Sequence, residues 1–433
     1  MSTTQLKRAH VLRKYNEGLL SRQTAATELR LSERQITRLS KGVRDEGEHA
    51  LIHKNTGRKP SHTLPDEIKE RILALRKEET YTKCNHAHFQ ELLLREHGIS
   101  LSYNALYTLL RTAGIHSPKK RRQAVKHRRR KRKTQAGELL QLDATPFDWL
   151  GSGCRQSLHA SIDDATGQIT GVYMTENECL HGYFAVMRQT VLSFGVPLSA
   201  YSDKHTIFRS PLTDRKAEQG EEANLTQFGR ALDELGINLI HAHSPQAKGR
   251  VERLWETLQS RLPVEFKLRN ITTVEDANHF LTNEFLQLFN SRFSVPAENG
   301  SLFIAYIGRE HIDDILCVKE TRKTDNAGSF SFRGQRFRVM DEGYPLIPAK
   351  ASVEVLIGVH SAIRVRYKGR VYATELSTTI ETPKHKPTKP RAVGTQVKSH
   401  LFYGSEEWKK IWHFQNYDES LAFIYEIFFK KAA

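Results

Sequence analysis

Residues 244–259 read SPQAKGRVERLWETLQ, a turn with proline and glycine followed by an amphipathic helix. The helix begins among the basic residues Lys248 and Arg250, and yet it carries Glu252 in its first turn. A carboxylate there is mildly favoured because it faces the positive end of the helix macrodipole. The same position also allows a helix to bring a third carboxylate to acids on neighbouring strands. The rest of the chain decides between these two interpretations.

Two other acids stand at the ends of segments with a strand pattern. Asp143 follows alternating apolar residues in LLQLDATP (139–146), and Asp203 ends PLSAYSD (197–203). From residue 136 to residue 259 the pattern predicts the order βββαβαβα, an α/β core in which strand ends and a helix converge on one site. Crowded carboxylates repel one another unless divalent cations neutralise them. Two such cations can clamp the oxygens of a phosphoryl transfer, and Mg²⁺ suits a site of a few carboxylates.

Three acidic motifs carry a family resemblance: LLQLDATP (139–146), GVPLSAYSDKHTIF (195–208) and HSPQAKGRVERLWETLQ (243–259). Together they resemble the motifs of the DDE transposase and retroviral-integrase superfamily, which has a ribonuclease H-like core. Within it the chain is most similar to bacterial insertion-sequence transposases of the ISNCY type, which have an integrase core domain. The resemblance covers residues 136–290 closely and the flanking segments more loosely.

The resemblance implies a catalytic and metal-binding role for three residues. Asp143 would bridge two Mg²⁺ ions, for which Mn²⁺ can substitute. Asp203 would bind one ion, and Glu252 would complete the other. The separation of Asp203 from Glu252 is longer than is usual in integrases, and the surplus falls in the polar segment 209–224. Glu252 is preferred as the third ligand because of its motif.

Other polar residues near these motifs have ordinary structural explanations. Asp163 and Asp164 fall in a predicted hairpin turn, where aspartate is common for conformational reasons. Glu256 lies one turn beyond Glu252 on the same helix face and is a weaker candidate ligand. His205, beside Asp203, is a weaker candidate for contact with a phosphate.

The net charge of +17 is concentrated in the first third of the chain. Residues 1–135 hold 31 Lys and Arg against 13 Asp and Glu, and the remaining residues hold 35 against 36. Such asymmetry indicates that the first third binds a polyanion. Its densest part is KKRRQAVKHRRRKRK (119–133), which has 11 basic residues out of 15 and cannot bury a core. We expect it to follow DNA phosphates, with a salt-dependent and sequence-independent contribution.

Two helical patterns in this basic region predict helix-turn-helix modules. In the first, Ser32 caps a helix that buries Ile36 and turns Arg and Gln outward, the side chains that read guanine and adenine edges. In the second, HGISLSYNALYTLL (97–110) repeats the turn-plus-helix layout. Ordinary helical hairpins are the alternative for both. The residues expected to contact DNA are Arg34, Gln35, Arg38, Tyr103, Asn104, Tyr107, Arg128, Arg129, Arg130, Lys248, Arg250 and Arg253.

The remaining composition excludes several classes of protein. The four cysteines are scattered, with no spacing typical of a disulfide framework or a zinc site. No apolar run approaches the roughly 20 residues that span a bilayer, and the N-terminus has no apolar signal region. We therefore expect a cytoplasmic protein, and the family resemblance implies a bacterial, nucleoid-associated one.

Beyond the core, short alternating segments from residue 328 predict a small β-barrel, followed by a Pro/Lys linker and an aromatic tail. The expected fold class is multidomain: all-α helix-turn-helix modules, a central α/β ribonuclease H-like integrase core and a small β-barrel. The predicted boundaries are 1–52 (first helix-turn-helix module), 53–115 (second module), 116–135 (basic linker), 136–300 (catalytic core), 325–380 (β-barrel) and 381–433 (linker and tail).

These features predict a transposase that binds the terminal repeats of an insertion sequence, cuts the element ends and joins the 3′-hydroxyl to target DNA. The resemblance implies a homodimer or higher oligomer on double-stranded DNA. One alternative is a DNA-binding regulator that has lost the chemistry, although a regulator has no need of three converging carboxylates. Another is a nuclease for RNA–DNA hybrids, although helix-turn-helix modules read duplex DNA.

Overall fold

A computed structural model of the protein describes residues 3–52, 64–118, 131–203, 205–209, 225–241, 249–308, 311–340, 343, 346–358 and 362–377. The chain divides into two compact units, residues 1–75 and residues 76–433. In these described ranges no helix is long and apolar enough to cross a membrane. All four cysteines lie in the described ranges, and each is a free thiol.

The first unit contains helices that close around a small apolar core of Leu12, Ala25, Ile36 and neighbouring residues. Arg30 ends one helix in the left-handed conformation, and Ser32 caps the next. The turn between these helices therefore follows the predicted layout, while its function as a DNA-reading motif stays a prediction. The elements are α1 (Thr3–Asn16), α2 (Arg22–Leu29), α3 (Glu33–Glu46) and the 3₁₀ helix η1 (Gly47–Leu51).

A second group of helices continues the chain across the division between the units. Asn85 and Ser102 cap its two longer helices, and Gly98 ends the first of these with a positive φ of 66°. The side chain of Gln90 donates to the carbonyl of Leu101 at 2.7 Å, which joins these helices. The elements are α4 (Asp66–Lys77), α5 (Glu79–Thr82), α6 (His86–His97) and α7 (Tyr103–Thr112).

A mixed five-stranded sheet forms the centre of the second unit, in the order β3-β2-β1-β4-β5. The first three strands form an antiparallel meander, whereas β4 and β5 run parallel to β1. The observed order of strands and helices confirms the predicted βββαβαβα pattern. The strands are β1 (Leu140–Phe147), β2 (Gln156–Asp163), β3 (Ile169–Thr175), β4 (Ser199–Ser202) and β5 (Asn238–His241).

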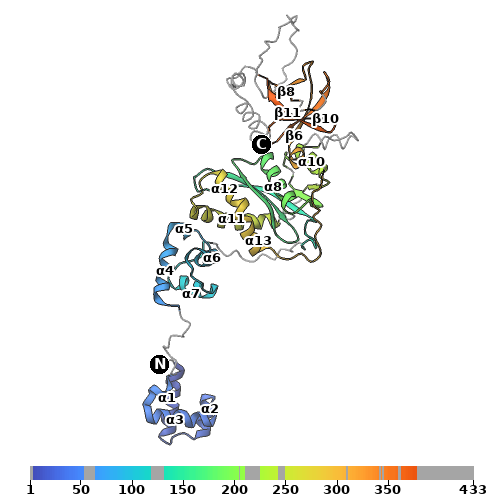
Figure 1. Cartoon of the computed structure of the whole chain (residues 1–433). Coiled ribbons are helices and arrows are strands. Elements are labelled where there is room, and N and C mark those ends of the chain that lie inside the picture. The colour runs from blue at the N-terminus through green and yellow to red at the C-terminus, as the bar shows by residue number, and fades with distance from the viewer. Residues whose placement is uncertain are drawn as a thin grey trace, which may run out of the picture. The chain divides into compact units, whose positions relative to one another are not determined.

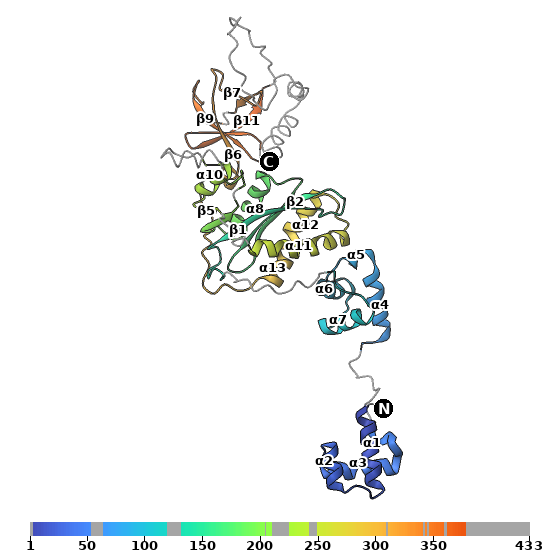
Figure 2. The same ribbon diagram turned by 180° about the vertical axis from the view of Figure 1, so that it is seen from behind.

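Helices cover both faces of this sheet (Figures 1 and 2). Leu142 belongs to the cluster on the α8 side, and Ala160 to the cluster on the α11 side. Neighbouring strand positions alternate between faces, so both layers are anchored on the same strands. The chain after residue 273 forms a long helical segment with π-helical geometry in its middle. The helices are α8 (Leu180–Ser193), α10 (Gln227–Glu234), α11 (Gly249–Leu268), α12 (Val274–Phe280), η3 (Leu281–Phe285) and α13 (Leu286–Phe293).

One glycine allows α8 to approach the sheet closely. A Cβ added at Gly171 would lie 2.4 Å from the carbonyl oxygen of Val186. We expect Gly171→Ala to lower the free energy of unfolding by about 1–3 kcal/mol, because the backbone of α8 must move outward. Chemical denaturation measures this loss. Gly300→Ala is the matched control, since a Cβ at Gly300 meets no atom within 4 Å, and an equal loss in both variants would contradict the explanation.

The C-terminal part is a six-stranded antiparallel sheet that is nearly closed, in the order β6-β9-β10-β11-β8-β7. The end strands β6 and β7 also contact each other, which gives the sheet a barrel-like form. It begins at Val318, before the predicted start of the barrel. The elements are α14 (Ile312–Ile315), β6 (Val318–Lys323), β7 (Ser329–Phe332), β8 (Gln335–Val339), β9 (Ser352–Ile357), β10 (Arg364–Tyr367) and β11 (Arg370–Leu376).

Candidate active site

Asp143 and Asp203 occupy equivalent positions on neighbouring parallel strands. The β1–β4 register pairs Leu140 with Ala200 and Gln141 with Tyr201. Continuing this register by two residues sets Asp143 beside Asp203, directly after the end of β4. Neighbouring strands lie about 4.8 Å apart, and both aspartates are half-buried. The topology therefore brings together two acids that are 60 positions apart in the sequence.

The first turn of α11 is hydrogen-bonded to β1 on both sides of Glu252. The backbone N–H of Val251 donates to Oε1 of Gln141 at 3.3 Å. Nε1 of Trp255 donates to Oδ2 of Asp143 at 2.8 Å. Glu252 lies in the helical turn between these two donors, and its own side chain is exposed. The helix thus carries its first-turn glutamate at the end of the sheet where Asp143 lies.

The buried carboxylate of Asp164 links Gln141 of β1 to Arg250 of α11. Its side chain is fully buried and accepts hydrogen bonds from Nε2 of Gln141 and Nε of Arg250, each at 2.7 Å. The backbone N–H of Lys133 donates to its other oxygen at 2.9 Å. Asp163 is also buried and accepts from the backbone of Gly137 and Thr166. The structural explanation of this aspartate pair is confirmed.

A further carboxylate, Glu178, belongs to the same neighbourhood. It accepts a hydrogen bond of 2.6 Å from the hydroxyl of Tyr183, a buried side chain on α8. Burial raises the pKa of Glu178 above its ordinary value, and the negative charges of Asp203 and Asp143 raise it further. The negative charges of these carboxylates repel one another, and a bound divalent cation would relieve that repulsion.

The donor atoms at this end of the sheet are hard carboxylate oxygens, the type that Mg²⁺ prefers. His205 donates its backbone N–H to Oδ1 of Asp203 at 2.9 Å, which orients that carboxylate. As placed, however, no three His, Cys, Asp or Glu side chains within the described ranges form a group that could hold a metal ion. The chemistry of the donors fits a divalent ion.

The expected DNA-contacting residues of α3 divide into two kinds. Arg34 and Arg38 are exposed. The side chain of Gln35 instead accepts from the backbone of Ser32 at 3.2 Å, while Oγ of Ser32 accepts from the backbone of Gln35. This reciprocal capping box stabilises the start of α3 and occupies the amide oxygen of Gln35.

On α7, the expected DNA-contacting residues form an exposed aromatic pair with a polar neighbour. The rings of Tyr103 and Tyr107 are stacked, with centroids 6.3 Å apart. They are 45% and 41% exposed, and Asn104 between them is exposed as well. These exposed aromatic side chains are accessible to a partner. Their contact with DNA stays a prediction.

Next to the third motif, the basic residues differ in their roles. Arg253 is exposed, and its Nε donates to the carbonyl of Gly249 at 2.9 Å. The guanidinium of Arg250 pairs with Asp164 and is only 12% exposed. Arg250 therefore has a structural role that its motif alone did not indicate. Lys248 and the basic-linker residues Arg128, Arg129 and Arg130 lie outside the described residues.

The residues that orient the site were not predicted from the sequence. Gln141 and Trp255 stand in the acidic motifs, whereas Glu178 and Tyr183 lie outside them, and no local pattern marks the contacts of any of these residues. The capping box of Gln35 is different, because its S-x-x-Q signature is readable in the sequence at residues 32–35.

Comparison with characterised sequences identifies the family. Over 322 residues the chain is 40% identical to the transposase for insertion sequence IS1202 of Streptococcus pneumoniae, covering 67% of this chain and 68% of that protein. It is also 33% identical over 374 residues to the putative transposase y4bF of Sinorhizobium fredii, covering 85% of this chain and 80% of that protein. The chain belongs to the family of insertion-sequence transposases. No family model matches it.

Solved structures similar to this transposase are retroviral integrases. A simian T-cell lymphotropic virus intasome in complex with a PP2A regulatory subunit aligns with a TM-score of 0.30 and 15% identity, covering 69% of the transposase and 97% of that chain. The HTLV-2 integrase catalytic core domain in complex with magnesium aligns with a TM-score of 0.25 and 16% identity, covering 35% and 88%. The predicted similarity to insertion-sequence transposases is confirmed by the two sequence relatives.

The tryptophan that contacts Asp143 provides a test of the site geometry. In Trp255→Phe the transposase keeps an aromatic side chain in the core but loses the hydrogen bond to Asp143. We expect DNA cleavage to slow by about 10- to 100-fold, as is typical when a group that orients a metal ligand is removed. Steady-state cleavage rates and the melting temperature should be measured together. Trp149→Phe is the control, because Trp149 is also buried and its Nε1 has no hydrogen-bond partner in the described part. Equal slowing in both variants would show that packing alone matters.

Proposed function

We propose that this transposase cuts DNA at the ends of an insertion sequence and joins the resulting 3′-hydroxyl to target DNA. The observation that carries the proposal is the alignment of Asp143 with Asp203, beside a helical turn that is bonded to Asp143 and carries Glu252. Membership of the transposase family supports it. The proposed location is the bacterial cytoplasm, in association with DNA.

In this proposal Asp143, Asp203 and Glu252 hold two Mg²⁺ ions, and Mn²⁺ substitutes for them. When bound, such ions activate the attacking oxygen and stabilise charge on the leaving oxygen of an in-line displacement. Asp143 is held by Trp255, and Asp203 by the backbone of His205. Both aspartates are therefore oriented before the substrate arrives, whereas Glu252 completes the site when the metal and DNA are present.

The proposed partners are the terminal repeats and the target, both double-stranded DNA, with the transposase acting as a homodimer or higher oligomer. Arg34 and Arg38 of α3 and the aromatic face of α7 would supply base contacts. The basic linker, including Arg128, Arg129 and Arg130, would follow phosphates, together with Lys248 and Arg253. Arg250 would contribute indirectly, by holding α11 in place.

A second candidate is a DNA-binding regulator that derives from a transposase and no longer cuts DNA. It is favoured by one observation, the absence within the described ranges of a group of three side chains placed to hold a metal. The regulator would bind element ends as tightly as an active transposase and leave them intact.

A cleavage assay distinguishes the two candidates. The full chain is incubated with labelled duplex containing the inverted repeats that flank its gene, in Mg²⁺, in Mn²⁺ or in EDTA. We expect strand breaks with a free 3′-hydroxyl at the repeat boundary in either metal and none in EDTA. Tight binding of the repeats without breaks in any metal would support the regulator, and breaks in EDTA would exclude the metal-dependent mechanism.

A further inference from the structure

Helix α6 contacts α11, the helix that carries Glu252, through two complementary rows of charged side chains. On α6 the row consists of His88, Glu91 and Arg95, with spacing i, i+3, i+7. On α11 and just past its end the row consists of Arg261, Glu265 and Arg269, with spacing i, i+4, i+8. Such spacings place each row on one helix face. The partners are about 170 residues apart in the chain. The α6–α11 ionic contact, as we call it, consists of His88, Glu91, Arg95, Arg261, Glu265 and Arg269, with Arg292 from α13.

One half of the contact is centred on Glu91. Both of its oxygens accept from Arg261, at 2.6 and 2.7 Å, and Arg292 adds a further contact at 2.8 Å. The Arg261 side chain is only 9% exposed. A two-point pair of this kind fixes orientation as well as distance, because the guanidinium and carboxylate planes must match.

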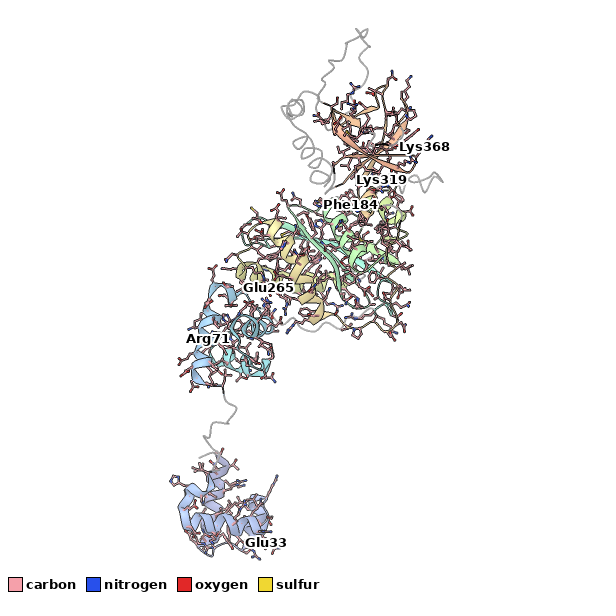
Figure 3. All side chains as sticks on the ribbon, viewed as in Figure 1. Glu33, Arg71, Phe184, Glu265, Lys319 and Lys368 are labelled. Atoms are coloured by element: carbon pink, nitrogen blue, oxygen red, sulfur yellow. The ribbon has the colours of Figure 1, made fainter. Side chains whose placement is uncertain are left out.

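The other half is centred on Glu265, labelled in Figure 3. Its carboxylate, 5% exposed, meets His88 at 2.9 Å and both Arg95 and Arg269 at 2.7 Å. Burial alone would raise the pKa of Glu265, but hydrogen bonds from His88 and Arg95 outweigh burial and lower the pKa to about 2. These partners thus favour the ionised form of the Glu265 carboxylate.

Helix α11 is held from two sides. Its apolar residues, including Leu254, Leu258 and Leu262, are buried against the sheet, and Trp255 is bonded to Asp143. Its charged row is bonded to α6, and α6 is in turn joined to the start of α7 through Gln90. A series of partly buried polar and apolar contacts therefore leads from the segment before α7, through α6 and α11, to the turn that carries Glu252. Along α11 the distance from Glu252 to Glu265 is about 20 Å, since a helix rises 1.5 Å per residue.

We propose that the α6–α11 ionic contact makes the α6–α7 helices and α11 one rigid body, which fixes the distance along the DNA between the base pairs held by α7 and the phosphate that is cut. This inference rests on the proposed function, because it specifies which DNA substrate that site accepts. An ionic contact suits the fixing of orientation better than apolar packing would. Paired polar groups in a core restrict how two helices can be oriented, even where they add little stability.

The test variant is Arg95→Met/Arg261→Met, which weakens both halves of the contact. It leaves no buried carboxylate unpaired, since Glu91 keeps Arg292 and Glu265 keeps Arg269. The matched control is Glu79→Gln/Lys267→Met, which removes an exposed pair between α5 and α11 whose side chains are 91% and 45% exposed. Exposed pairs contribute little to rigidity.

The first readout needs no catalysis. Hydrogen exchange of the α6 and α7 amides should be at least tenfold faster in the test variant, with exchange in β1–β3 unchanged, and the control should match the parent protein.

The second readout is the position of cleavage on end DNA. We expect the parent and the control to cut one phosphate and to lose at least tenfold in rate when about five base pairs, half a turn of duplex, are inserted before it. The test variant should bind the same DNA but cut at several neighbouring phosphates and tolerate the insertion.

A single, spacing-sensitive cut in the test variant would overturn the inference, as would unchanged hydrogen exchange. If the parent protein cuts no DNA at all, the proposed function fails and the inference fails with it, whereas cutting without spacing sensitivity removes the inference alone.

Discussion

Asp143→Asn, Asp203→Asn and Glu252→Gln are each expected to slow metal-dependent cleavage of element ends by at least about a thousandfold, which corresponds to about 4 kcal/mol of lost transition-state stabilisation. Each substitution replaces a charged oxygen donor with a neutral amide of nearly the same shape, so the fold should persist. Binding of end DNA, measured by fluorescence anisotropy, should change by less than about threefold, because the proposed base and phosphate contacts are made by other side chains.

Glu256→Gln is the matched control for this series. Glu256 is an exposed acid on the same helix, one turn beyond Glu252, and we expect its substitution to leave the cleavage rate close to that of the parent protein. If Glu256→Gln is inactive while Glu252→Gln is active, the helix supplies a different ligand from the one proposed. Full activity of Asp143→Asn or Asp203→Asn would remove that residue from the site.

Asp164→Ala is expected to lower the free energy of unfolding by about 3–5 kcal/mol, the usual cost of removing one partner of a buried ion pair. The substitution leaves the guanidinium of Arg250, the amide of Gln141 and the backbone N–H of Lys133 without the carboxylate that they share. It should also slow cleavage, because Gln141 and Arg250 locate the start of α11. Urea denaturation followed by tryptophan fluorescence measures the stability.

The comparison for this prediction is Asp313→Ala, which also breaks an aspartate–arginine pair. Asp313 and its partner Arg188 have side chains that are 23% and 40% exposed, so we expect a loss of less than about 1 kcal/mol. Similar losses in the two variants would contradict the role assigned to Asp164.

Much of the candidate site could be predicted from the sequence because its parts are local. Asp143 and Asp203 belong to segments with a readable alternation, and Glu252 follows a turn that starts a helix. The prediction that Asp143 ends its strand is wrong, because β1 continues to Phe147, and the alignment of the two aspartates comes from the observed β1–β4 register. The roles of these acids in metal binding and catalysis stay predictions.

The contacts that orient these acids could not be predicted in the same way. Arg250 stands in a motif full of basic residues, and its partner Asp164 is 86 positions away. The partners of the α6–α11 ionic contact are farther apart still. Such pairs are decided by tertiary packing, and a single sequence has many acids and bases that satisfy charge matching equally well. Ser32 and Gln35 show the opposite case, where a capping motif of four residues is readable in the sequence.

The central claim, that Asp143, Asp203 and Glu252 surround one metal-binding site, is tested most directly by a crystal structure of the transposase with end DNA and Mn²⁺. Anomalous scattering would locate the metal independently of any assumption about the ligands. The account predicts two peaks, one beside both aspartates and one beside Asp143 and Glu252, each at about 2.0–2.3 Å from carboxylate oxygens. A complex with DNA in place and no metal at these residues, or metal bound without Glu252, would contradict it.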